Sequence, residues 1–306
     1  MELIRINNNV MPIKEGVAAT IGQFDGLHIG HLKLFNETLS LSKIENVKSA
    51  VITFDPHPDF ILCKDKDLSY ITPFEKKVEL ISNLGFDYLF VIEFNKDIAN
   101  ISPLDFVTNY LVKLNVRFSV VGFDFSFGYK GQGKAEDIEK LSGSLIKNKI
   151  IEEVKIDNNK ISSIDVKKSL VKGDVKNANI LLGRYYEISG IVVYGNQVGS
   201  KINVPTANIL YDDSYVKLSP GVYVTLFEYN DNTYPSITNI GHNPSFNYSN
   251  KISMECHIID FNEDIYQKEV TVKFVEKIRD EIKFNNVEEF KIQIEKDKKH
   301  ALSILG

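Results

Sequence analysis

Apolar positions in the first 150 residues follow two alternating patterns, short continuous runs and runs at helical spacing. Residues 17–21 have the pattern of a buried strand that stops at a glycine, and apolar side chains then recur over residues 29–39 at the spacing of a helix. The same alternation predicts strands over residues 50–54, 87–92 and 118–121, and helices over residues 73–84 and 102–114. Strands that alternate with helices pair in parallel through right-handed crossovers, so this half is predicted to be a doubly wound α/β domain.

After about residue 185 the pattern changes to the period-two alternation of antiparallel strands. Such segments occupy residues 188–194, 221–229, 252–261 and 270–275, with turns rich in Gly, Asn and Asp between them, and one long helix pattern starts at residue 287. This half is predicted to be a small antiparallel β-barrel with a C-terminal helix. The chain shows no low-complexity linker, and we predict domains over residues 1–184 and 185–306.

Composition narrows the class of protein. The 306 residues are 43% hydrophobic and 25% charged, which is typical of a globular protein with about two domains. The net charge of −5 and the lack of a dense Lys/Arg block argue against a nucleic-acid partner. No apolar run has the length of a signal peptide or a membrane span, so we expect a cytoplasmic protein without a membrane partner. Cys63 and Cys256 are predicted to be free buried thiols, and the oligomeric state is left open.

A string rich in glycine and histidine joins the first strand to the first helix. Gly22, Gly26 and Gly30 let the backbone approach a phosphate without a Cβ atom in the way. The first turn of the helix offers unpaired N–H groups to an anion. His28 and His31 are three residues apart, so on a helix both rings fall on one face, where they suit the charge that develops in phosphoryl or nucleotidyl transfer. The alternative is two surface histidines near a turn.

The order His-x-Gly-His is the signature of the nucleotidyltransferase superfamily, and residues 22–31 resemble the start of the bacterial FAD synthetases. Residues 53–58 and 120–128 also resemble that family, in its order. The resemblance implies catalysis by His28 and His31, ATP or phosphate binding by Gly22, Phe24, Asp25, Gly26, Gly30, Ser162, Ser163 and Lys167, and flavin binding by Asp124 and Phe127.

The second half carries the string Val-Pro-Thr-Ala-Asn over residues 204–208. Thr206 and Asn208 are two apart on an extended chain, so their side chains face the same side. Both offer hard oxygen donors, which suit Mg²⁺ held mainly by substrate phosphates. The alternative is a plain polar turn. Pro-Thr-Ala-Asn is, however, the hallmark of the riboflavin kinase family, and the rest of this half resembles that family in order.

The kinase resemblance implies that Glu255 is the catalytic base. It would accept the proton of the ribityl 5′-hydroxyl as that oxygen attacks the γ-phosphate of ATP. The alternative is a solvated strand glutamate, since Met254 and Cys256 flank it on the opposite face. The resemblance further implies ATP contacts by Gly199, Thr206 and Asn208, a metal site at Thr206 and Asn208, and flavin contacts by Arg279, Glu281 and Phe284.

Nearly the whole chain therefore resembles the bifunctional bacterial riboflavin kinases/FMN adenylyltransferases. That resemblance implies ATP with Mg²⁺ and the flavins riboflavin, FMN and FAD as substrates and products. The sequence departs from the family near the end of the first domain, where a string resembling Ser-Ser-Thr-Arg-Ile-Arg has Asp165 and Lys167 in place of its arginines. The kinase loop departs too, with Asn203 and Val204 in place of Gly-Phe and Ser200 in place of an arginine. Ser126 also stands where the family usually has arginine, so cations that neutralise a triphosphate are missing.

These departures keep other hypotheses open. In the first hypothesis, only the kinase half is active. In the second, the chain is a flavin-binding regulator or storage protein. The third takes the two histidines as a remnant of an aminoacyl-tRNA synthetase, which the acidic charge and the Pro-Thr-Ala-Asn string oppose.

Overall fold

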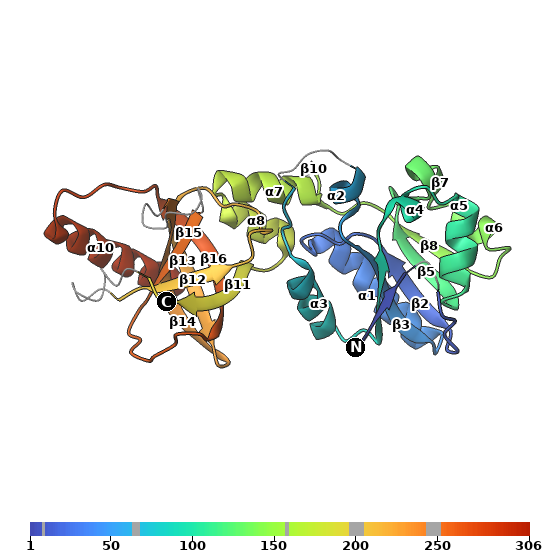
Figure 1. Cartoon of the computed structure of the whole chain (residues 1–306), viewed down its shortest axis with the longest axis horizontal. Helices are drawn as coiled ribbons and strands as arrows, with labels where there is room; N and C mark the ends of the chain where they lie inside the picture. Colours follow the sequence, from blue (N-terminus) through green and yellow to red (C-terminus); the bar gives the residue numbers. More distant parts are fainter. Residues whose placement is uncertain (8–9, 63–67, 157–158, 196–204, 243–251) are drawn as a thin grey trace. The chain divides into compact units, whose positions relative to one another are not determined.

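The computed structural model describes residues 1–306 except residues 8–9, 63–67, 157–158, 196–204 and 243–251 (Figure 1). The described chain forms two compact units, residues 1–162 and residues 163–306. Helices α7 (Ser163–Lys172) and α8 (Val175–Leu182) fall in the second unit by their contacts. The division of function between residues 184 and 185 stays a prediction.

A six-stranded, all-parallel sheet forms the centre of the first unit. The parallel pairing confirms the prediction, whereas the sequence analysis predicts only four of the six strands and misses β1 and β8. Its spatial order is β1 (Glu2–Ile6), β4 (Tyr88–Glu93), β3 (Lys48–Asp55), β2 (Val17–Ile21), β5 (Val116–Gly122) and β8 (Lys147–Ile151). All five residues of β2 are buried. The carboxyl ends of parallel strands meet at one edge, so the loops after β2, β3, β4 and β5 gather where such sheets bind ligands.

Successive strand residues point to opposite faces of this sheet, and both faces are apolar, so helices cover both of them. On β3, Ile52 packs in one apolar cluster with Phe106, and Val51 packs in another with Phe35 and Ile81. This two-sided core confirms the doubly wound architecture. The remaining elements of the unit are α1 (Ile29–Ile44), α2 (Pro58–Leu62), α3 (Phe74–Asn83), α4 (Lys96–Ala99), α5 (Pro103–Phe106), the π-helical η1 (Val107–Val112), β6 (Ser126–Phe127), the 3₁₀ turn η2 (Tyr129–Gly131), β7 (Gly133–Lys134), α6 (Asp137–Leu141), β9 (Lys155–Ile156) and β10 (Asn159–Lys160).

A closed, antiparallel six-stranded barrel forms the core of the second unit and confirms the predicted architecture. The strands follow one another around the barrel as β11 (Tyr186–Val193), β12 (Ala207–Tyr211), β15 (Ile252–Ile258), β14 (Asn232–His242), β13 (Gly221–Tyr229) and β16 (Glu269–Arg279). The C-terminal helix is α10 (Val287–Leu305). Cys256 is a buried free thiol in β15, and Cys63 lies outside the described residues.

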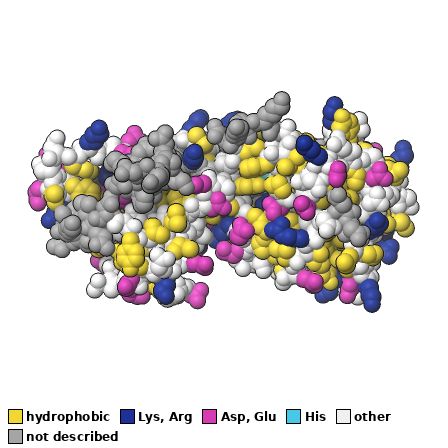
Figure 2. Space-filling model, in the orientation of Figure 1, with side chains coloured by type: hydrophobic (Ala, Val, Ile, Leu, Met, Phe, Trp, Pro, Cys, Tyr) yellow, Lys and Arg dark blue, Asp and Glu magenta, His cyan; other side chains and the backbone are white. Residues whose placement is uncertain are grey.

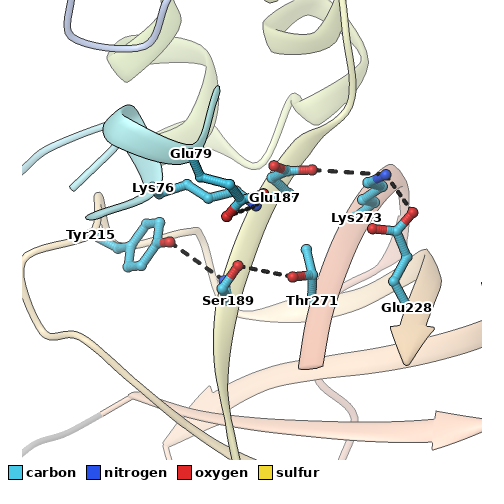
Figure 3. Close-up of polar contacts among 8 residues, drawn as sticks. All are labelled: Lys76, Glu79, Glu187, Ser189, Tyr215, Glu228, Thr271 and Lys273. Carbon is cyan, nitrogen blue, oxygen red and sulfur yellow. Dashed lines mark hydrogen bonds and ion pairs between the residues drawn. The ribbon is translucent and has the colours of Figure 1, made fainter. Parts of the chain in front are cut away.

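Side-chain contacts tie β16 to both of its neighbours (Figure 3). Lys273 on β16 forms ion pairs with Glu187 on β11 and with Glu228 on β13. The hydroxyls of Ser189 and Thr271 lie 2.9 Å apart across the β11–β16 pair. These polar links support the closure of the barrel, which leaves its strands without open edges.

Charges of both signs are interspersed with apolar side chains over the face drawn in Figure 2. Among the helices of the described residues, none combines the length and the apolar composition that a membrane span requires.

Two candidate active sites

The loop between β2 and α1 brings the two motif histidines together. His28 is the N-cap of α1, and its Nδ1 accepts a hydrogen bond of 3.4 Å from the backbone N–H of His31. The two rings stack with their centroids 3.6 Å apart. A Cβ atom on Gly30 would lie 3.1 Å from the His28 ring, so glycine makes room for this stacking. Because Nδ1 of His28 accepts, the neutral ring carries its proton on Nε2, which remains a donor.

The glycine turn before these histidines is fastened to the segment that leads into α3. Oδ1 of the buried Asp25 accepts hydrogen bonds from the backbone N–H groups of Ile71 (2.9 Å) and Thr72 (3.1 Å). Gly26 has a φ of +83°, and a Cβ there would lie 2.9 Å from Ile71. Phe24 is buried with its ring edge against His31. These contacts hold the turn in shape, and phosphate binding by its residues stays a prediction.

A buried lysine that the sequence analysis missed reaches the same turn. Nζ of Lys77 on α3 donates a 2.8 Å hydrogen bond to the backbone oxygen of Gln23, which also accepts one of 3.3 Å from the Thr53 hydroxyl. Burial lowers the pKa of Lys77, and the negative charges of Asp25 and Asp55 act in the opposite direction. Lys77 therefore places a hydrogen-bond donor behind the loop, and no local sequence signal separates it from a solvated helix lysine.

A cavity of about 790 Å³ lies beside this loop in the first unit. Asp124 and Phe127, both predicted to bind flavin, line it together with Gly22. Most of the other walls are aromatic or aliphatic: Phe54, Pro58, Ile61, Leu62, Phe94, Ile98, Ile101, Phe106, Phe125 and Tyr129. Asp124 forms an ion pair with Lys160 on β10. The walls therefore combine a large apolar surface with a few polar groups, as ligand pockets do.

The altered serine motif lies at the start of α7. Ser163 is the first residue of this helix, and Asp165 stands in its first turn, 3.8 Å from Lys168. An acidic residue is favourable there because the helix N-terminus carries partial positive charge. Ser162 ends the first unit, whereas Ser163 and Lys167 belong to the second. Their contact with a triphosphate stays a prediction.

Strand register assembles the candidate site of the barrel. Glu255 on β15 stands opposite Asn208 on β12 and opposite Asn239 on β14, so three polar side chains form a row across neighbouring strands. The amide of Asn208 lies where a Cβ on Gly195 would be, which explains the glycine. Thr206 comes directly before β12. The hydroxyl of Thr206 and the amide oxygen of Asn208 fit a Mg²⁺ ion that takes most of its ligands from phosphates.

A second carboxylate stands near Glu255. Burial raises the pKa of Glu255, and the negative charge of Glu281 raises it further. Oε1 of Glu281 accepts a 3.5 Å hydrogen bond from the Asn239 amide and occupies the space where a Cβ on Gly241 would be. The barrel therefore holds a carboxylate with increased proton affinity beside its predicted metal ligands.

A smaller cavity of about 290 Å³ lies beside Thr206 and is not lined by the three residues of this row. Thr206, Cys256, Ile265 and Tyr266 are among its lining residues. The Tyr266 ring stacks on Tyr194 with 4.0 Å between centroids. Burial raises the pKa of the Cys256 thiol to about 11, so this sulfur is a neutral wall of the cavity at physiological pH.

The other predicted flavin residues of the barrel differ in surroundings. Arg279 donates from Nε and Nη2 to Oδ2 of Asp297 on α10, at 3.0 and 2.8 Å, and Asp297 is almost fully buried. Phe284 packs edge-on against Phe290, with 5.4 Å between ring centroids. Flavin contacts by these residues stay predictions, and Gly199 lies outside the described residues.

Comparison with known proteins agrees with the two halves. The FAD synthetase family model matches residues 10–165, and the riboflavin kinase family model matches residues 182–305. A bifunctional riboflavin kinase/FMN adenylyltransferase of Bacillus subtilis is 37% identical over 312 residues, covering 99% of this chain and 98% of the relative. The chain belongs to the bifunctional riboflavin kinase/FMN adenylyltransferase family.

Other members and one solved structure agree with this assignment. The family member of Escherichia coli strain K12 is 31% identical, covering 100% of this chain and 98% of the relative. A crystal structure from Streptococcus pneumoniae, described as a macrolide-efflux protein, has a TM-score of 0.89 at 29% identity and covers 97% of each chain. The fold of this chain is therefore similar to that solved structure over nearly the full length of both chains.

Proposed function

We propose that this chain makes both flavin cofactors, FMN in the barrel and FAD in the parallel-sheet unit. Riboflavin and MgATP give FMN and ADP in the first reaction, and FMN and MgATP give FAD and pyrophosphate in the second. The observation that carries this proposal is the match of both family models in order, each over a unit with a cavity beside its motif.

Glu255 is the proposed base of the kinase reaction. Its carboxylate accepts the proton of the 5′-hydroxyl of riboflavin while that oxygen attacks the γ-phosphorus of ATP and ADP leaves. The raised pKa of Glu255 suits this task because it brings the affinity for a proton closer to neutral pH. A Mg²⁺ ion, when bound, neutralises phosphate charge. Thr206 and Asn208 would hold this ion, and the cavity beside Thr206 would receive the nucleoside of ATP.

The stacked histidines are the proposed donors of the adenylyl transfer. A phosphate oxygen of FMN attacks the α-phosphorus of ATP, and pyrophosphate leaves. Nε2–H of His28 and the N-terminus of α1 stabilise the negative charge that develops on the transferred group. The large cavity beside Gly22 has the apolar walls that suit the three fused rings of a flavin.

A second candidate is that only the kinase reaction remains. Asp165 and Lys167 stand where the family has arginines, so the adenylyltransferase half has lost two fork-shaped triphosphate ligands. The partners of either function are flavins and ATP, and we propose that the chain works in the cytoplasm.

Incubation of the full chain with riboflavin, ATP and Mg²⁺, followed by separation of the flavins, tests these functions. FAD as a product supports the bifunctional enzyme. FMN without FAD supports the kinase alone. Unchanged riboflavin together with measurable flavin binding contradicts both and favours a binding protein.

A further inference from the structure

Gln23 lies in the loop between β2 and α1. Its backbone oxygen accepts hydrogen bonds from Lys77 Nζ at 2.8 Å and from Thr53 Oγ1 at 3.3 Å. Its neighbours Gly22 and Phe24 begin the turn that ends at the histidine pair. Two donors from separate elements thus hold the main chain of Gln23 and fix the position of its Cα atom.

The amide of this side chain has no hydrogen-bond partner among the described residues. Both Oε1 and Nε2 of Gln23 are enclosed by protein atoms and make no hydrogen bond there. Enclosed polar atoms in folded proteins almost always have partners, so an amide with two unmatched atoms points to a partner that arrives later. The side chain can turn about its own torsions, while the backbone stays held by Lys77 and Thr53.

Gln23 lines the 790 Å³ cavity of the first unit. Most walls of this cavity are apolar, and they match the ring system of a flavin better than its polar arm. Gly22 and Gln23 form the part of the wall that continues along the chain into His28. A flavin nucleotide with its rings against the apolar walls would extend its ribityl phosphate toward Gln23 and the histidines.

We propose that the amide of Gln23 binds the ribityl phosphate arm of FMN and orients its phosphate for attack on ATP. Nε2 donates to a phosphate oxygen, and Oε1 accepts from a ribityl hydroxyl, so both atoms gain partners of the right kind. Nζ of Lys77, hydrogen-bonded to the backbone oxygen of the same residue, holds the main chain from which this amide extends. This assignment rests on the proposed adenylyltransferase activity.

Steady-state kinetics of FAD synthesis test the assignment on the full chain, with FMN and ATP varied separately. Gln23→Leu should raise KM for FMN by about 10-fold or more, the size expected for a lost hydrogen bond to a charged group, and change KM for ATP less than about twofold. Gln23→Glu places a carboxylate next to the phosphate and should raise the KM for FMN further. Gln23→Asn keeps the amide and should recover part of the loss.

Two controls separate this effect from misfolding. Gln132→Leu removes an exposed glutamine of the same unit that does not line the cavity, and it should leave both KM values unchanged. Riboflavin phosphorylation by each variant should equal that of the wild type. An unchanged KM for FMN in Gln23→Leu, or a rise in KM for ATP alone, overturns the assignment. A wild type that makes FMN but no FAD overturns the adenylyltransferase proposal, and this assignment with it.

Discussion

The two candidate sites are assembled in different ways. The site of the sheet unit comes from one continuous string, in which Gly30 leaves room for His28 to stack on His31. The site of the barrel comes from separate strands, whose register sets Glu255 between Asn208 and Asn239. A site built from one string is visible in the sequence, whereas a site built by strand pairing is visible only when the register is known.

The two sites also differ in charge. The barrel places Glu255 near Glu281, and the like charge and burial together raise the pKa of Glu255. The sheet unit instead places its histidine pair at the N-terminus of α1, where Lys77 supports the preceding loop from behind. A carboxylate pair suits proton abstraction beside a metal-bound phosphate, while a helix N-terminus suits the binding of an anion.

The largest expected effect is on stability, and it tests whether Arg279 in the barrel stabilises the fold or binds flavin. Arg279 and Asp297 form a bidentate ion pair with side-chain exposures of 15% and 4%. Arg279→Ala leaves the Asp297 carboxylate buried without its cation, and we expect a loss of about 3–5 kcal/mol of unfolding free energy. Urea denaturation of the wild type and of Arg279→Ala measures this difference in unfolding free energy. An Arg279→Ala chain of normal stability but raised KM for riboflavin would show instead that this guanidinium binds flavin.

Glu255→Gln should separate the two activities. The change is nearly isosteric and removes the proposed base, so FMN formation should fall by about 10²-fold or more. FAD synthesis from added FMN should stay at the wild-type rate. Glu269→Gln, on an exposed residue of the same barrel, is the matched control and should change neither rate.

His28→Asn should give the opposite separation. Asparagine keeps a side chain that can cap α1 and removes the imidazole, so stability should hold while FAD synthesis falls by about 10²-fold. His28→Ala loses the cap as well and should also unfold about 1 kcal/mol more easily. His31→Ala should lower FAD synthesis to a similar extent. His300→Asn, on an exposed face of α10, is the control. Equal FAD synthesis in wild type and His28→Asn would remove the histidines from the mechanism.

The pH dependence of the kinase reaction tests the carboxylate pair. A base acts only when deprotonated, so a raised pKa of Glu255 makes the rate of FMN formation fall on acidification at a higher pH than an ordinary glutamate allows. Glu281→Gln removes the like charge and should move this fall to lower pH. The measurement is kcat/KM for riboflavin against pH. A profile that does not move would mean that Glu281 leaves the pKa of Glu255 unaffected.

The smallest expected effect concerns Asp165. If the first turn of α7 approaches the triphosphate, Asp165→Arg should increase FAD synthesis about 10-fold, because it reverses an opposing charge, and salt should reduce the gain. If Asp165 only stabilises the helix N-terminus, the change should lower stability by about 0.3–1 kcal/mol and leave the rate alone. Rates at two salt concentrations, with a melting curve, distinguish the two roles.

Much of the fold could be predicted from hydrophobic patterning. Strands β2 and β13 were predicted with the bounds they have, because buried and alternating runs are local signals. Strands β1, β12 and β14 were missed: β1 is short and terminal, and β14 carries Pro235. The helix predicted over residues 102–114 is an α-helical turn followed by a π-helical one.

The candidate sites also contain residues that the sequence predicts and residues that only tertiary packing brings together. The histidine pair lies within four residues, and its spacing predicts both rings on one helix face. In the structure His28 is instead the extended N-cap of α1, and its ring stacks on that of His31. Lys77 reaches Gln23 across 54 residues, and Arg279 reaches Asp297 across 18. Asn239 joins Glu255 only through strand register. Such partners depend on tertiary packing, and single-sequence patterns contain no signal for them.

The central claim, two separate sites in one chain, is tested most directly by mixing the Glu255→Gln and His28→Asn chains. With riboflavin, ATP and Mg²⁺, the first chain alone should make little FMN, and the second alone should make FMN but little FAD. Because FMN made in one chain can diffuse to the other, the mixture should convert riboflavin to FAD at a rate close to that of the wild type. A mixture that makes no more FAD than the two chains apart, although each keeps its other activity, would contradict the account.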